Sequence, residues 1–155
     1  MKPLESPEAV SDTLEARIAQ ITVANGYETD IGLNVLVGKR KLAADDEIPC
    51  ANIIDFAQNP KDLTKGAATD AYVEQRFLVV GTAACEDKDR PNATGHKILR
   101  DIKKAIWKDG TTWGGLVGQV KFTGSDMGMR PEGGDFMQGA VSLTVSYVER
   151  LGGAA

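Results

Sequence analysis

Reactive and metal-binding side chains are scarce in this chain. Its 155 residues include one histidine, His96, and two cysteines, Cys50 and Cys85. A single histidine cannot form a clustered-histidine metal site, and it leaves a Ser/His/Asp triad only one candidate base. The cysteines lie in apolar, strand-like surroundings without Cys-x-x-Cys spacing, which predicts buried thiols rather than a metal site or a redox pair. We therefore expect no catalytic residue, no metal and no cofactor.

Long apolar runs and a basic excess are also missing. No run approaches the roughly 20 apolar residues of a membrane helix, and the first five residues do not resemble a secretory leader. These features predict a soluble, cytoplasmic protein without a membrane partner. Lys and Arg number 18 against 22 Asp and Glu, a formal charge of −4. This balance opposes the phosphate neutralisation on which nucleic-acid affinity depends, so we expect no tight binding to DNA or RNA.

Recognisable ligand-binding loops are absent as well. The glycines from Gly114 to Gly118 have neither the spacing nor the following helix of a phosphate-binding loop. The acidic residues Glu86, Asp87 and Asp89 lack the glycine and the distant glutamate of a calcium-binding EF-hand. We interpret the glycines as points of close backbone approach and the acidic residues as solvated charges.

The apolar pattern predicts one domain, residues 1–155, of the α+β class. A first helix begins at Ser6 and Pro7 and ends near Gly26, and a second is capped by Asn92 or Thr94 and ends at Asp109. Strands are expected at residues 28–37, 48–56, 72–83, 116–122 and 137–148. The second half of the 72–83 strand should be buried on both faces. We expect a mainly antiparallel sheet of about five strands with the two helices packed on one face.

Two stretches do not fit regular elements and are candidates for contact with a partner. Residues 57–70 read as a loop, longer than most connections, and are the first candidate for a binding surface. Patches of opposite charge, Lys39-Arg40-Lys41 and Asp45-Asp46-Glu47, fit either a solvated loop or contact with an identical neighbour. The candidate subunit or axial interface therefore comprises Lys39, Arg40, Lys41, Asp45, Asp46, Glu47, Asp62, Lys65 and Trp113.

The two tryptophans are expected to serve packing. Trp107 extends the apolar face of the second helix, and Trp113 anchors the glycine-rich turn against the sheet or against a neighbour. In the last strand, apolar residues at Val141, Leu143 and Val145 alternate with the hydroxyl residues Ser142, Thr144 and Ser146. The hydroxyl face could meet solvent, a neighbouring subunit or a wet channel.

Several of these segments, taken in order, resemble the tail terminator proteins of long-tailed bacteriophages. The similar segments are Ile18-Ala19-Gln20-Ile21, Gly26-Tyr27-Glu28-Thr29-Asp30-Ile31-Gly32, Ile48-Pro49, the helix from Ile98 to Ile106, Trp113-Gly114-Gly115-Leu116 and the closing strand through Tyr147. The resemblance covers nearly the whole chain. It lies in structural patterns rather than chemical signatures.

The resemblance implies a structural virion protein and no catalysis. Such a protein forms a ring, typically of six copies, caps the head-proximal end of the tail tube, stops its polymerisation and presents a surface to the head–tail connector. The implied partners are other copies of the chain, the tail tube protein and the connector protein, with DNA passing through the lumen without specific binding. The implied location is the virion neck. The alternatives are a connector, a tail tube subunit, or a small enzyme using Asp101, Asp109 or Glu132.

Overall fold

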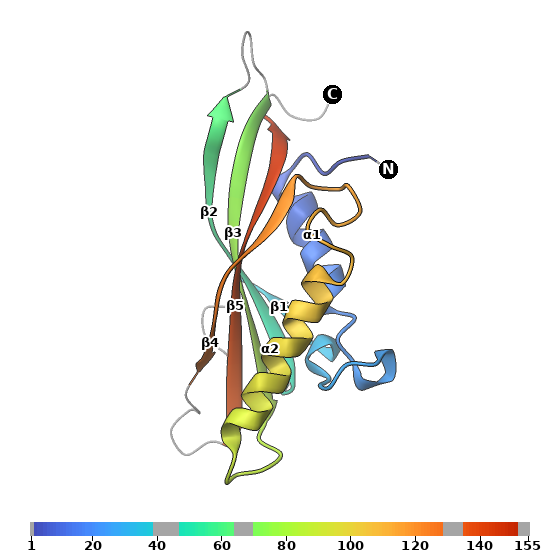
Figure 1. Ribbon diagram of the computed structural model, residues 1–155, viewed down its shortest axis with the longest axis vertical. Coiled ribbons are helices and arrows are strands. Elements are labelled where there is room, and N and C mark those ends of the chain that lie inside the picture. The colour runs from blue at the N-terminus through green and yellow to red at the C-terminus, as the bar shows by residue number, and fades with distance from the viewer. Residues whose placement is uncertain (1, 39–46, 64–69, 129–134, 152–155) are drawn as a thin grey trace.

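One five-stranded sheet with both helices on one face forms the fold (Figure 1). The computed structural model describes residues 2–38, 47–63, 70–128 and 135–151. The helices are α1 (Pro7–Ile18) and α2 (Pro91–Trp107), and the strands are β1 (Val35–Val37), β2 (Cys50–Leu63), β3 (Asp70–Ala84), β4 (Gln119–Gly128) and β5 (Phe136–Arg150). The strand order is β1-β2-β3-β5-β4, with β1 parallel to β2 and all other neighbours antiparallel. The predicted α+β fold is confirmed.

The core lies between the helices and one face of the central strands. β3 and β5 pair without interruption from Asp70 opposite Arg150 to Ala84 opposite Phe136. Because strand side chains alternate between faces, the odd-numbered residues of both strands face the helices. Phe77 lies opposite Leu143 there, and both are buried.

A pair of glycines lets α2 lie close to the sheet. Gly81 of β3 lies opposite Gly139 of β5, and both face Ile98 of α2. A Cβ atom at Gly81 would lie 2.5 Å from Cγ2 of Ile98, and one at Gly139 would lie 3.0 Å from the same atom. Glycine is therefore required for this helix–sheet contact.

The first helix begins as its sequence predicts but ends earlier. Ser6 precedes it and its Oγ accepts a hydrogen bond from the backbone N–H of Ala9 (3.2 Å). Val10, Leu14 and Ile18 form the buried stripe. The helix ends at Ile18 rather than near Gly26, and the predicted remainder contains a short 3₁₀ turn.

The strand predicted at residues 28–37 is wrong for most of its length. Only Val35–Val37 is a strand. The side chain of Asp101 on α2 accepts hydrogen bonds from the backbone N–H groups of Glu28 and Thr29, which removes these donors from any sheet ladder. A 3₁₀ turn, Ile31–Leu33, then packs against the chain at the end of α1, where the N–H of Gly32 donates to the carbonyl oxygen of Ile21 (2.8 Å).

The loop predicted at residues 57–70 is also wrong in its first half. β2 continues to Leu63 and pairs with β3 as far as Leu63 opposite Ala71. Gln58, Asn59 and Pro60 are exposed, so no apolar alternation marks this part of the strand. The backbone ladder forms nonetheless because pairing depends on the backbone groups rather than on burial of the side chains. Residues 64–69 lie outside the described residues.

The start of the second helix differs from the prediction. α2 begins at Pro91, which suits the first helical position because proline lacks an N–H. Thr94, one of the two expected caps, lies inside the helix, and its Oγ1 accepts from the backbone N–H of Glu86 (3.3 Å). Within the described ranges, no helix combines the length and apolar character needed to cross a membrane.

Candidate assembly interface

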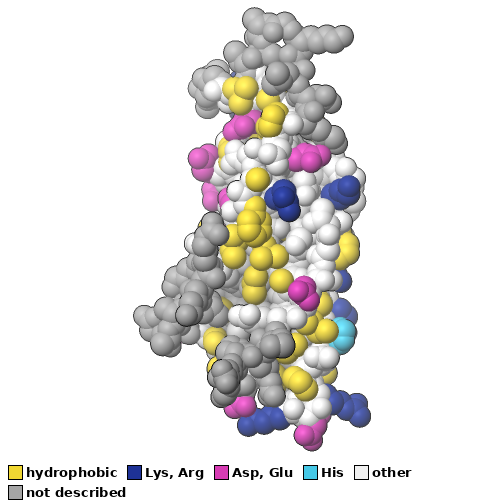
Figure 2. Space-filling view, turned by 90° about the vertical axis from the view of Figure 1, so that its left-hand side faces the viewer, with side chains coloured by type: hydrophobic (Ala, Val, Ile, Leu, Met, Phe, Trp, Pro, Cys, Tyr) yellow, Lys and Arg dark blue, Asp and Glu magenta, His cyan; other side chains and the backbone are white. Residues whose placement is uncertain are grey.

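Neither of the described helices α1 and α2 lies over the opposite face of the sheet (Figure 1). Figure 2 views the molecule from this side, and hydrophobic side chains gather in the middle of the face with charged groups around them. We call it the open face. On β2, β3 and β5 the even-numbered side chains lie on this face. They are Tyr72, Glu74, Arg76, Leu78, Val80 and Thr82 of β3, the even-numbered residues from Gln138 to Val148 of β5, and Cys50, Asn52 and Ile54 of β2.

An apolar row crosses the centre of the open face. Ile54 lies opposite Leu78, and Val80 lies opposite Ala140 on the next strand. All four are only partly buried, whereas the odd-numbered side chains of the same strands are buried under the helices. The prediction that the second half of β3 is buried on both faces is therefore wrong for Leu78 and Val80. The prediction assumed that another layer covers these hydrophobic residues, but the described residues supply no layer on this side.

The hydroxyl side chains of β5, at Ser142, Thr144 and Ser146, form a row beside the apolar row. Thr144 lies between Arg76 and Lys121, and Ser146 lies between Glu74 and Gln119. Thr144 is 9% exposed and Ser146 4% exposed, although no helix covers them. Plain solvent exposure is therefore wrong for these two residues. Contact with a neighbouring subunit and a position along a wet channel stay predictions.

Most of the predicted charged interface lies outside the described residues. This holds for Lys39, Arg40, Lys41, Asp45, Asp46 and Lys65. Glu47 is described and exposed, and its carbonyl oxygen accepts from Nδ2 of Asn34 (3.1 Å). Asp62 lies in β2 opposite Tyr72, so it belongs to a strand rather than to a loop; its side chain is outside the described part.

Trp113 lies in the core rather than at a surface. It is 2% exposed, its Nε1 donates to the carbonyl oxygen of Ile106 (2.9 Å), and the Arg17 guanidinium lies 5.2 Å from the ring centroid. Its inclusion among the interface residues is a prediction that this burial contradicts. Trp107 is partly buried, and its Nε1 donates to the carbonyl oxygen of Val120 (2.9 Å). Both indoles join the end of α2 to neighbouring chain segments.

The carboxylates considered for catalysis do not converge. Asp101 is 2% exposed and accepts from backbone N–H groups and from Thr29 Oγ1 (2.7 Å), which makes it a structural group. Asp109 is exposed and forms an ion pair with Arg17 (3.2 Å). Glu132 lies outside the described residues. His96 is exposed near the start of α2.

The hydrogen bond that Arg100 donates to Glu28 (2.7 Å) lowers the pKa of that carboxyl. Across the described part of the chain, no group of three or more His, Cys, Asp or Glu side chains is placed to hold a metal ion. The open face is therefore the strongest functional feature of the described residues.

In the comparisons with known proteins, no family model matches the chain and no curated protein is a significant match.

Proposed function

We propose that the chain is a structural subunit that assembles as a ring, caps the head-proximal end of a phage tail tube and provides the surface for head joining. The resemblance stated above motivates the proposal. The observation that carries it is the apolar row of Ile54, Leu78, Val80 and Ala140 on a sheet face that no described helix or strand covers. A second copy would remove this surface from water.

The arrangement of the open face suits a ring contact. A head-to-tail ring joins two different surfaces of one subunit, so a face of this kind can meet a neighbour's opposite side. The other side of the subunit carries α2, on which Lys104 and the Glu28-paired Arg100 are exposed, and Lys108 is exposed directly after its end. The open face carries Glu74 and Asp126 together with Arg76 and Lys121, so its charges are mixed and a neighbour's charges would have to match them position by position.

The acidic balance supports the DNA part of the proposal. The formal charge is −4 per chain, so six copies give six times −4, or −24. A ring of this charge favours passage of DNA over its capture. Retention on DNA at physiological salt is expected to be negligible.

The first test measures whether the protein assembles into a ring and whether the apolar row of the open face is needed for that assembly. The wild-type protein is expected to form a closed ring by light scattering and negative-stain imaging. Leu78→Lys places a charge in the apolar row and should leave a folded monomer, as judged by circular dichroism. Leu33→Lys is the matched control, because Leu33 is 71% exposed and lies outside the open face. A monomeric wild type, alone and with tail tubes, would contradict the ring.

The second test measures function. Tails assembled without the chain should overgrow or fail to join heads. Tubes of normal length that join heads normally would exclude the terminator role, leaving a connector or tube subunit as the assignment.

A further inference from the structure

Two exposed cations lie in one row of the open face. Arg76 of β3 and Lys121 of β4 lie on either side of Thr144 in β5. Both are exposed, and neither forms an ion pair with a described residue. Because neighbouring strands are about 4.8 Å apart, the Cα atoms of these two residues lie about 10 Å apart across the sheet. We call Arg76, Thr144 and Lys121 the basic row.

The basic row borders the apolar row of the open face. Leu78 follows Arg76 by two residues on β3, so their side chains are neighbours on the same face. The acidic Glu74 and Asp126 lie in other rows of this face. A partner that covers Leu78 therefore brings its own side chains over the basic row. Burial of these cations would be costly unless the partner supplies acidic groups.

The solvent face of α1 carries the complementary charge. Glu8, Asp12 and Glu15 are spaced by four and three residues, which places them on one stripe of the helix. Glu8 and Asp12 are exposed and Glu15 is partly exposed, and none of them forms an ion pair with a described residue. We call these three residues the acidic stripe. Its ends are separated by about 10.5 Å along the helix axis, close to the separation of the cations in the basic row.

No cation on α1 competes with the acidic stripe. Every residue of this helix is described, and its one basic side chain is Arg17. The Arg17 guanidinium forms an ion pair with Asp109 (3.2 Å), lies 5.2 Å from the ring centroid of Trp113, and its side chain is only 13% exposed. Ala16, one turn after Asp12, is exposed and small. The helix can therefore approach an apolar surface closely.

The surface of α2 does not suit the basic row, because its exposed charges are of the same sign. Lys104 and Arg100 are exposed, and the one acidic residue of this helix, Asp101, is 2% exposed. Laying this surface over the basic row would bring like charges together, which disfavours the contact. Of the two helices on the far side of the subunit, α1 is therefore the one that matches the open face.

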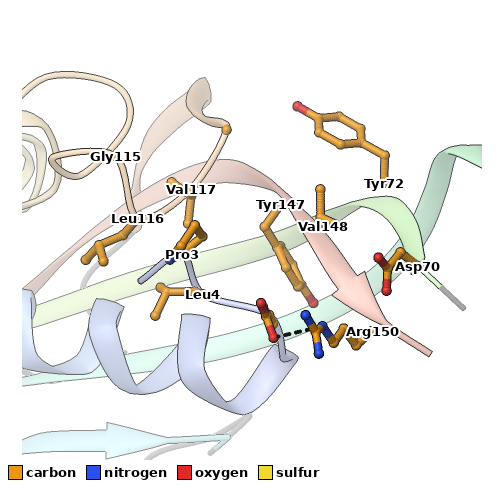
Figure 3. A pocket seen from close by; sticks show the side chains of 12 residues that line it. Pro3, Leu4, Asp70, Tyr72, Gly115, Leu116, Val117, Tyr147, Val148 and Arg150 are labelled. Carbon is orange, nitrogen blue, oxygen red and sulfur yellow. Dashed lines mark ion pairs between the residues drawn. The ribbon is translucent and has the colours of Figure 1, made fainter. Parts of the chain in front are cut away.

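The start of α1 is fixed to the sheet, which gives the acidic stripe a defined position. The N–H of Leu4 donates to the carbonyl oxygen of Leu116 (2.9 Å), and the N–H of Arg150 donates to the carbonyl oxygen of Glu5 (3.3 Å). The side chains of Glu5 and Arg150 form an ion pair (3.2 Å) beside a pocket at this end of the sheet, which Figure 3 shows. Glu5 is thus paired within the subunit, in contrast to the acidic stripe.

We propose that the acidic stripe of one copy docks on the basic row of the next copy, with α1 laid across the strands and Ala16 over the apolar row. The proposal rests on the proposed ring and names the two surfaces that its subunits join. α1 and the open face lie on opposite sides of the sheet (Figure 1), so one copy presents both surfaces at once. A contact between two different surfaces can repeat from copy to copy.

Zero-length cross-linking tests the contact directly. A mixture of unlabelled and isotope-labelled full-length protein is treated with a carbodiimide, which joins a lysine amine to a carboxylate where the two touch, and the cross-linked peptides are identified by mass spectrometry. Peptides that join Lys121 to the acidic stripe and carry one label of each kind are expected. Their absence from the assembled wild type would overturn the proposal.

Charge reversal gives an independent measure. Arg76→Glu should raise the concentration at which half of the protein assembles about tenfold in low salt, because an attraction becomes a repulsion. Adding Glu8→Arg or Glu15→Arg, whichever faces position 76, should bring it back to within about threefold of wild type. Asp89→Arg, an exposed reversal outside α1, should not restore assembly, and Lys108→Glu alone should leave it unchanged. Failure of both α1 reversals to restore assembly, or a loss with Lys108→Glu equal to that with Arg76→Glu, would overturn the proposal.

The outcomes separate this contact from the ring itself. Cross-linked copies in open chains would support the contact and contradict the ring. Closed rings in which neither the cross-links nor the charge reversals involve the acidic stripe would support the ring and overturn the contact. A protein that stays monomeric would contradict both. Circular dichroism of each variant shows whether a loss of assembly is a loss of fold.

Discussion

Replacing Asp55 by asparagine should stabilise the protein. Asp55 lies on β2 and accepts a hydrogen bond from Nε2 of Gln75 (3.3 Å). Gln75 is fully buried, and its Oε1 has no hydrogen-bond partner among the described residues. An ionised carboxylate can only accept, so it cannot satisfy Oε1. An asparagine can accept from Nε2 and donate to Oε1 at the same time.

The magnitude follows from one added hydrogen bond and one removed charge. A net hydrogen bond contributes about 1 kcal/mol. Burial, partly offset by the hydrogen bond from Gln75, raises the pKa of Asp55, which means that the folded protein disfavours the charge. Because Asp55 is also partly exposed, water screens this effect, and we expect a total gain of about 1 kcal/mol in the free energy of unfolding at pH 7.

The gain should depend on pH in a defined direction. A carboxyl whose pKa is raised on folding holds its proton more tightly in the folded state. Wild-type stability at this site therefore rises as pH falls from neutrality through the raised pKa of Asp55. A protonated Asp55 can donate to Oε1 of Gln75, as asparagine does. The advantage of Asp55→Asn should be largest near pH 7 and shrink toward the ordinary aspartate range.

Urea unfolding followed by tryptophan fluorescence measures both effects, at pH about 7 and at pH about 4.5. Asp126→Asn is the matched control, since Asp126 is exposed on β4, and it should change stability by less than about 0.5 kcal/mol. In a Gln75→Leu background the hydrogen-bond part of the gain should disappear, whereas the part that comes from removing the partly buried charge should remain. A destabilised Asp55→Asn variant, or a gain that is equal at both pH values, would refute the reasoning.

Three further predictions test the packing. Trp113→Ala should cost about 3 to 5 kcal/mol in unfolding free energy because the indole is buried, and a loss below 1 kcal/mol would contradict its place in the core. Asp101→Asn should destabilise by about 2 to 4 kcal/mol in urea unfolding, whereas Asp109→Asn, which removes the same charge from an exposed ion pair, should cost less than about 1 kcal/mol; equal losses would show that the Asp101 hydrogen bonds contribute little. Gly81→Ala should cost about 1 to 3 kcal/mol because its Cβ meets Ile98, and an unchanged thermal midpoint would show that α2 can move away.

The sequence predicts the parts of the fold whose side chains alternate between water and core. The apolar stripe of α1 and the alternation of β5 identify their elements because each buries one side. The extension of β2 through Asn59 and Pro60 has no such signal, because both faces are exposed and only the backbone ladder defines it.

The error at residues 28–37 has a different origin. The apolar alternation there is real, yet Asp101, more than 70 residues away, takes the backbone donors of Glu28 and Thr29. A contact of that sequence separation leaves no local pattern. Burial of Trp113 likewise depends on Arg17 and Ile106, which reach it from two helices. The candidate charged interface was chosen from local charge alone, and most of it falls outside the described residues.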